Sequence, residues 1–116
     1  MKLVLLSLLS LALTTSSAFA GFVTAEQVIK EYDSENLKPY ILMHVHGVGS
    51  GMEWTNAYYK REGNKPIFCK PNDIPINAEG FYQIFEKEYS RKPEIYKDMP
   101  LAVPLIYGMI STYPCE

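Results

Sequence analysis

Cys69 and Cys115 are the two cysteines of this sequence, and their thiols are the most reactive side chains that it carries. A cysteine beside a histidine can act as a nucleophile, but two cysteines and no others in an exported chain are more simply explained by a disulfide. In a chain-entropy model, closing a loop of this length removes about 4 kcal/mol of unfolded-state freedom, comparable to the net stability of a small domain. The sequence therefore predicts a Cys69–Cys115 disulfide that closes the second half of the domain.

His44 and His46 are the only histidines, and imidazole is a common metal ligand. Residues two apart on a helix point about 200° away from each other, so they cannot hold one ion together. On a strand they could, but zinc needs a third and a fourth ligand, and no residues follow at a spacing typical of such a site. We expect no metal site, and histidines that are partly buried or lie at an interface.

Three glycines follow the histidines, at Gly47, Gly49 and Gly51. They resemble a phosphate-binding loop only superficially, because the Gly-Lys-Ser/Thr ending and a preceding strand are missing. In one interpretation Gly47 and Gly51, four residues apart, form a smooth helix face that another helix can approach closely. In the other, the glycines break or kink the helix, since each weakens it by up to about 1 kcal/mol relative to alanine. We favour a continuous or kinked helix.

Aromatic and basic side chains gather at the end of the same segment. They are Trp54, Tyr58, Tyr59, Lys60 and Arg61. Trp54 and Tyr58 are four apart and share a helix face, so amphipathic packing explains them, and we favour that interpretation. The alternative is a protein-binding hot spot, because Trp, Tyr and Arg dominate such sites. The sequence has no Gly-x-Ser-x-Gly motif and no clustered carboxylates, so we expect neither an enzyme nor a cofactor.

Four predicted helices must position these residues. Thr24, with Gln27 three residues on, forms a capping box for a short helix that ends at about Tyr32. A long helix is predicted to start at Pro39, with Asn36 as a possible cap, and to run to about Arg61.

Two further helices follow a proline-rich, irregular connection. Asn77 is a good cap for an amphipathic helix that ends near Lys92-Pro93, and its inward face carries Phe81, Ile84, Phe85 and Glu88. The regular part of the last helix is predicted to start close to Pro104, because proline is tolerated only near the first turn. Its residues Leu101, Leu105, Ile106, Met109 and Ile110 make it apolar almost all round, which is typical of a domain centre or a subunit interface. The expected fold is a small all-α, four-helix domain.

The first twenty residues are typical of an export signal. Lys2 precedes the apolar residues 3–13, and Ala18-Phe19-Ala20 has the small-x-small form that signal peptidase needs, which predicts cleavage after Ala20. A run of about eleven apolar residues is too short to span a bilayer comfortably, which argues against an uncleaved anchor. Residues 21–116 then form a single domain, for which we expect no association with the membrane.

Charge excludes one class of partner. Without Lys2, the predicted mature chain has ten basic and thirteen acidic residues and a net charge of −3. That mild acidity, without a basic patch, argues against nucleic-acid binding but is compatible with a protein partner.

The order of these features resembles a known family. An export signal, a short helix, a glycine-containing helix and an amphipathic helix occur together with Cys69-Lys70-Pro71, a Lys-Pro-Glu-Ile-Tyr connector and Tyr113-Pro114-Cys115. This arrangement is similar to the Rap/Tai family of periplasmic immunity proteins, which neutralise peptidoglycan amidase effectors of type VI secretion. The resemblance covers nearly all of residues 21–116.

The resemblance implies an all-α periplasmic domain, often a homodimer, that binds a secreted amidase and occludes its active-site cleft. The effector-facing residues expected from exposure and composition are Tyr59, Lys60, Arg61, Glu62 and Asn64. The residues expected to pair two chains, or two helices, are Gly47, Gly51, Leu105 and Met109.

A different class of function is also compatible with the sequence. Periplasmic acid-stress chaperones of the HdeA kind are small, helical and closed by one long disulfide loop. Such a protein dissociates and exposes apolar surface at low pH, as its carboxylates lose their charge. An amidase gene beside this one would favour immunity, whereas reversible dye binding in acid would favour the chaperone.

Overall fold

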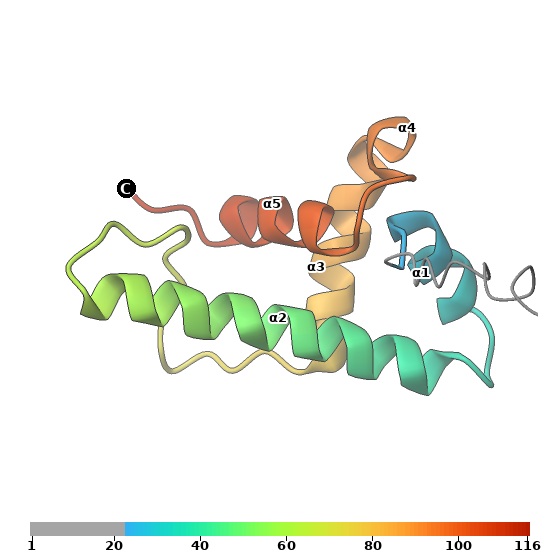
Figure 1. The fold of residues 1–116 in the computed structure, drawn as a ribbon, viewed down its shortest axis with the longest axis horizontal. Helices are drawn as coiled ribbons and strands as arrows, with labels where there is room; N and C mark the ends of the chain where they lie inside the picture. Colours follow the sequence, from blue (N-terminus) through green and yellow to red (C-terminus); the bar gives the residue numbers. More distant parts are fainter. Residues whose placement is uncertain (1–22) are drawn as a thin grey trace, which may run out of the picture.

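The computed structural model describes residues 23–116 of the chain. Within this range the chain folds into five helices (Figure 1), which are α1 (Ala25–Tyr32), α2 (Lys38–Arg61), α3 (Ala78–Arg91), α4 (Pro93–Tyr96) and α5 (Ala102–Thr112). The all-α prediction is confirmed, with one helix more than expected, because the predicted Lys-Pro-Glu-Ile-Tyr connector contains the single turn α4. The predicted signal peptide, residues 1–20, and its cleavage site lie outside the described residues.

Helix α1 begins with the predicted capping box. The Gln27 N–H donates to Thr24 Oγ1 at 3.2 Å, and the Thr24 N–H donates to Gln27 Oε1 at 3.0 Å. The start of this helix is also tied to the chain before α5, because the Ala25 N–H donates to the Met99 carbonyl at 2.8 Å. An isolated antiparallel bridge between Thr24 and Pro100 lies at the same place. Local capping and several long-range contacts to the chain before α5 therefore position the start of α1.

Helix α2 is continuous through all three glycines, as predicted, and Pro39 lies in its first turn. The prediction that Asn36 caps it is wrong. The cap residue is Leu37, whose side chain makes no capping hydrogen bond, because a turn leads directly into the helix. The carbonyl of Ser34 accepts from the backbone N–H groups of Leu37 and Lys38 at 3.1 and 2.8 Å, so backbone atoms replace the side-chain cap.

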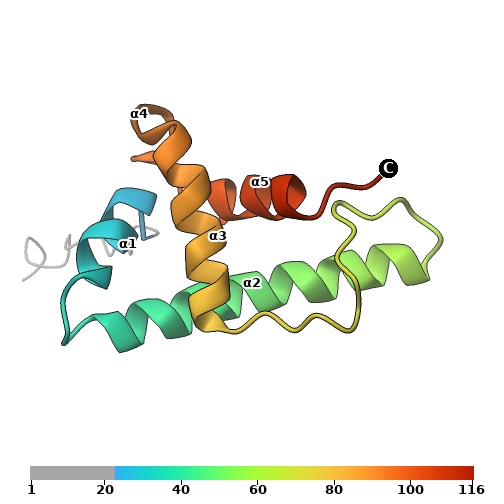
Figure 2. The same ribbon diagram turned by 180° about the vertical axis from the view of Figure 1, so that it is seen from behind.

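Helix α3 lies across α2 and α5, which run alongside each other (Figure 2). It begins at the predicted cap, where Asn77 Oδ1 accepts from the Gly80 N–H at 2.8 Å, and it ends just before Lys92 and Pro93. Helix α5 begins at Ala102, two residues before the predicted Pro104. Pro104 is still within the first turn, where its missing N–H removes no helical hydrogen bond.

The core fills the space between α1, α2, α3 and α5. Its buried hydrophobic residues are Ala25, Val28, Ile41, Val45, Phe68, Phe81, Tyr82, Phe85, Leu101, Leu105 and Met109. Two of the predicted pairing residues, Leu105 and Met109, are fully buried here within one chain. None of the helices between residues 23 and 116 combines the length and the apolarity that a bilayer crossing requires.

In α2, the glycine that allows another helix to approach closely is Gly49, not the predicted pair. A Cβ atom added to Gly49 would lie 2.4 Å from Cδ1 of Phe81, so α3 packs directly against the backbone of α2. Gly47 and Gly51 point away from this contact, and an added Cβ there meets nothing within 4 Å. Within one chain the predicted smooth face is therefore empty, because it lies on the opposite side of α2 from α3.

One buried carboxylate links α3 to α4. Glu88 is 6% exposed, and its Oε1 accepts from the Tyr96 hydroxyl at 2.8 Å. Its other oxygen pairs with Arg91 Nη1 at 3.1 Å. Burial, and after it the hydrogen bond to Glu88, together raise the pKa of Tyr96 to about 12.

Candidate functional site

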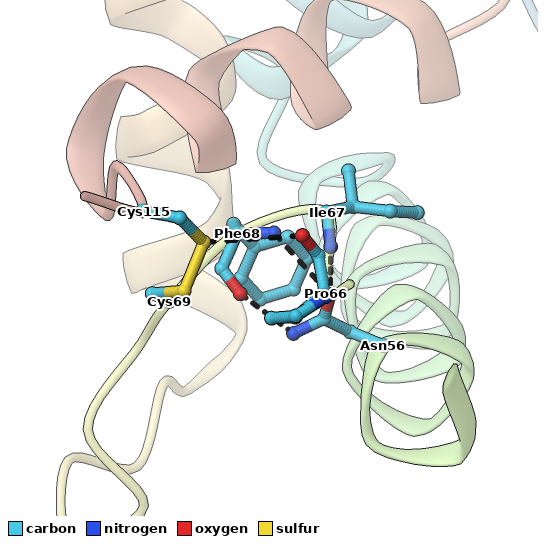
Figure 3. The surroundings of a disulfide bond; sticks show 6 residues. All are labelled: Asn56, Pro66, Ile67, Phe68, Cys69 and Cys115. Carbon is cyan, nitrogen blue, oxygen red and sulfur yellow. Dashed lines mark hydrogen bonds between the residues drawn. A yellow bond between two sulfur atoms is a disulfide. The ribbon is translucent and has the colours of Figure 1, made fainter. Parts of the chain in front are cut away.

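The loop of residues 66–72 is fixed to the end of α2 by Asn56 (Figure 3). Asn56 Nδ2 donates to the Phe68 carbonyl at 2.8 Å. Its Oδ1 accepts from the backbone N–H groups of Ile67 and Phe68, at 2.6 and 3.3 Å. One side chain thus satisfies three backbone groups of a loop that has no regular structure of its own.

The predicted Cys69–Cys115 disulfide is confirmed and holds the other side of this loop. The two Cα atoms are 4.9 Å apart, and the Cys69 N–H donates to the Tyr113 carbonyl at 2.8 Å. Between the Asn56 contact and the disulfide, the Phe68 side chain is buried in the core. The loop is therefore held at three consecutive points, to α2, to the core and to the C-terminal segment.

A groove runs between this loop and the last three turns of α2. It has a volume of about 950 Å³. We call it the α2–loop groove, and its lining residues are Ser50, Glu53, Trp54, Asn56, Ala57, Lys60, Arg61, Pro66, Phe68, Cys69, Lys70, Pro71 and Asn72. A smaller hollow of about 380 Å³ lies between α3 and the C-terminal segment, and Lys87 lines it.

Lys70 and Glu53 form the polar part of the groove where α2 faces the loop. The Lys70 side chain is only 11% exposed, and its ammonium lies 3.6 Å from Glu53 Oε1. The same ammonium donates to the carbonyls of Pro71 and Ile74. Within residues 23–116 the Glu53 oxygen is buried and accepts no hydrogen bond, so Lys70 supplies its compensating charge. The positive charge of Lys70 is therefore compensated within the protein, by Glu53 and two backbone carbonyls.

Two exposed aromatic side chains, Trp54 in the groove lining and Tyr58 one turn further along α2, lie at this end of the helix. Trp54 is 77% exposed and Tyr58 is 52% exposed, so the favoured interpretation, amphipathic packing, is wrong for the described chain. Their shared face points to solvent because the core lies on the side of α2 that carries Val45 and Gly49. The Arg61 guanidinium lies 5.5 Å from the centre of the Tyr58 ring, a cation–π arrangement.

The residues predicted to face an effector all lie at this end of the molecule and are exposed. Lys60 and Arg61 line the groove. Tyr59 lies in the last turn of α2 outside the groove lining, and Glu62 and Asn64 lie on the turn that follows α2. The Asn64 N–H donates to the Tyr59 carbonyl at 2.8 Å, which holds that turn.

The residues that build the groove were not predicted from the sequence. Glu53, Asn56 and Lys70 act only through contacts between α2 and a loop whose contacting residues are eleven or more positions away along the chain. The one available signal was the run of prolines around Cys69, which indicated an irregular segment next to the disulfide.

The predicted interface residues and the histidines lie elsewhere. Gly47 and Gly51 are exposed on α2, as are His44 and His46. The His46 ring meets the edge of Phe81, with ring centres 6.0 Å apart. In the part of the chain that the structure describes, no three His, Cys, Asp or Glu side chains gather in a way that could hold a metal ion.

Comparison with known proteins gives no match to a family model, to a curated protein or to a solved structure. Function must therefore be inferred from the groove, the exposed aromatic side chains and the charges at the end of α2.

Proposed function

We propose that this protein is an immunity-type, protein-binding domain that occludes the active-site cleft of a secreted peptidoglycan amidase. The observation that carries the proposal is the exposure of Trp54, at 77%, beside Tyr58 and Arg61. These three residue types dominate the energy of protein interfaces, and such large aromatic side chains gain the most when a partner covers them. The amidase as partner comes from the resemblance to the Rap/Tai family.

The shape of this end of the molecule suits occlusion. The turn that follows α2 is at one extremity of the described domain (Figure 1). The adjoining loop is held by Asn56, by Phe68 and by the disulfide. Because such a surface is already ordered, binding loses little conformational entropy there, which favours affinity.

The proposal is tested with the oxidised protein of residues 21–116 and the amidase encoded beside its gene. We expect a complex on gel filtration and loss of peptidoglycan cleavage. Tyr58→Ala should weaken this complex by about 2 kcal/mol, or about thirtyfold in Kd, as truncation of a hot-spot residue does. Tyr40→Ala is the matched control, because Tyr40 is a 67% exposed tyrosine at the other end of the same helix.

Two results would contradict the proposal. If no complex forms with the adjacent amidase, the protein is not its immunity protein. If Tyr58→Ala and Tyr40→Ala have equal effects, the contact surface is not at the C-terminal end of α2. Reversible dye binding and dissociation in strong acid would instead support the acid-stress chaperone.

A further inference from the structure

We infer that the α2–loop groove binds a short acidic segment of the partner protein, with a carboxylate at Lys60 and Arg61 and the rest of the segment against Trp54. The inference deepens the proposed function, because it assumes that the partner is a protein. It names the chemistry of the segment that enters the groove.

The charges of the groove favour a carboxylate. It is lined by three cationic residues and a single anionic one, Glu53. Lys70 is already engaged by Glu53 and two carbonyls, so Lys60 and Arg61 remain. Among residues 23–116 no carboxylate forms an ion pair with Lys60.

Arg61 is also available to a partner. Its Nε atom lies 3.5 Å from Glu62 Oε1, but the Arg61 side chain is 74% exposed and the Glu62 side chain is 49% exposed. Exposed pairs of this kind contribute at most about 1 kcal/mol, so a better-placed carboxylate replaces Glu62 at little cost. Because the predicted mature chain carries a net charge of −3, this positive site stands out against an acidic background and would steer an acidic segment toward it.

The size of the groove, and the backbone of the loop that borders it, limit how the segment can bind. A volume of about 950 Å³ suits a short stretch of chain and not a whole domain. The segment cannot pair with residues 66–69 as an added strand, because the N–H groups of Ile67 and Phe68 are taken by Asn56 and that of Cys69 by Tyr113. Pro66 and Pro71 have no N–H to offer. Recognition therefore falls to the charged side chains and to Trp54.

Trp54 makes the inference directly measurable, because it is the only tryptophan of the chain and lines the groove. The probe is a random copolymer of glutamate and tyrosine, titrated into the oxidised protein while tryptophan fluorescence is recorded. We expect a saturable change in the Trp54 emission and no such change with a copolymer of lysine and tyrosine.

Charge reversal locates the binding site. Lys60→Glu should weaken binding of the acidic copolymer by at least about tenfold, because a like charge then faces the carboxylates. Lys87→Glu is the matched control, since Lys87 is exposed and lines the other hollow of the surface. It should leave the affinity within about twofold. Lys60 is exposed, so its replacement does not disturb the core, and circular dichroism verifies that both variants are folded.

Several outcomes would overturn the inference. These are an unchanged Trp54 emission, equal losses in the two variants, equal binding of the lysine copolymer, or equally tight binding of a single-stranded oligonucleotide. The outcome for the proposed function is separate. If the amidase binds the original protein and the Lys60→Glu variant equally, the proposed function stands and the groove inference fails. If only the copolymer binds, in a Lys60-dependent manner, the groove inference stands and the amidase proposal fails.

Discussion

The side chain of Asn56 pairs with both backbone groups of Phe68, donating to its carbonyl at 2.8 Å and accepting from its N–H at 3.3 Å. One side-chain amide of α2 thereby satisfies both backbone groups of a residue in an irregular loop. The contact places Phe68 in the core and the wall of the groove beside α2.

Asn56→Ala should lower the free energy of unfolding by about 1–3 kcal/mol, because it leaves the carbonyl and N–H of Phe68 without their partners. Urea titration followed by circular dichroism measures the loss. Asn64→Ala is the control, because Asn64 is exposed and its side chain makes no hydrogen bond among the described residues. We expect a change within about 0.5 kcal/mol there. Equal stability of the two variants would show that the Asn56 contact does not hold the loop.

Alanine at the three glycines of α2 should change stability in opposite directions. At Gly47 and Gly51 an added Cβ meets nothing within 4 Å, so alanine should stabilise the protein by up to about 1 kcal/mol through helix propensity. At Gly49 the same atom would lie 2.4 Å from the buried Phe81 ring. In Gly49→Ala, overpacking should lower the free energy of unfolding by about 1–3 kcal/mol. The higher helix propensity of alanine offsets part of this loss. Thermal unfolding of the three variants gives the comparison. A Gly49→Ala variant as stable as Gly47→Ala would contradict the packing of α3 on α2.

Removal of the disulfide should destabilise the domain by about 4 kcal/mol in the chain-entropy model. The variant replaces both Cys69 and Cys115 by serine, which opens a loop with a sequence separation of 46 residues. Denaturant titration measures the difference, and a reductant should shift the original protein toward the variant. The double-serine variant is its own control, because a reductant should leave it unchanged. If reduction leaves the original protein equally stable, the bond does not stabilise the fold.

The free energy of unfolding should fall at alkaline pH, because ionisation of the buried tyrosines is unfavourable in the folded state. Burial, and then the hydrogen bond to Glu88, raise the pKa of Tyr96 to about 12, and burial also raises the pKa of Tyr82. A tyrosine that stays neutral in the folded state contributes stability that is complete below the unfolded pKa of about 10 and is lost as the pH rises toward the folded value. We therefore expect the free energy of unfolding to decline between about pH 10 and 12.

Tyr96→Phe tests this alkaline decline. It should cost about 1–3 kcal/mol near neutral pH, because Glu88 loses a buried hydrogen bond, but the decline above about pH 10 should become shallower. Tyr40→Phe is the control, because Tyr40 is 67% exposed on α2. Urea titrations at several pH values supply both slopes. Identical slopes in the original protein and Tyr96→Phe would exclude Tyr96 as a source of the pH dependence.

Much of the local structure follows from single residues and their immediate neighbours. Two helix starts were predicted correctly, one from Thr24 with Gln27 and the other from Asn77. In each, the side-chain oxygen of the cap residue accepts from a backbone N–H three residues further on, so the contact does not depend on the rest of the fold. Asn36 does not cap the helix, because the backbone carbonyl of Ser34 accepts from the N–H groups of Leu37 and Lys38. A rule based on residue type does not predict that a backbone carbonyl will take the place of a side-chain cap.

The sequence by itself determined the all-α class, the approximate helix bounds and the pairing of Cys69 with Cys115, because these depend on short-range chemistry and on a count of two thiols. Only the tertiary structure decided which face of α2 is buried. Apolar residues occur on both of its faces, with Val45 inside and Trp54 outside, so the hydrophobic pattern did not choose between them. The packing of α3 decides which face is buried, because the Phe81 ring fits against α2 only where Gly49 has no side chain. Trp54 lies on the opposite face of α2 and is therefore exposed to solvent. It lines the groove beside the loop that Asn56 and the disulfide fix in place.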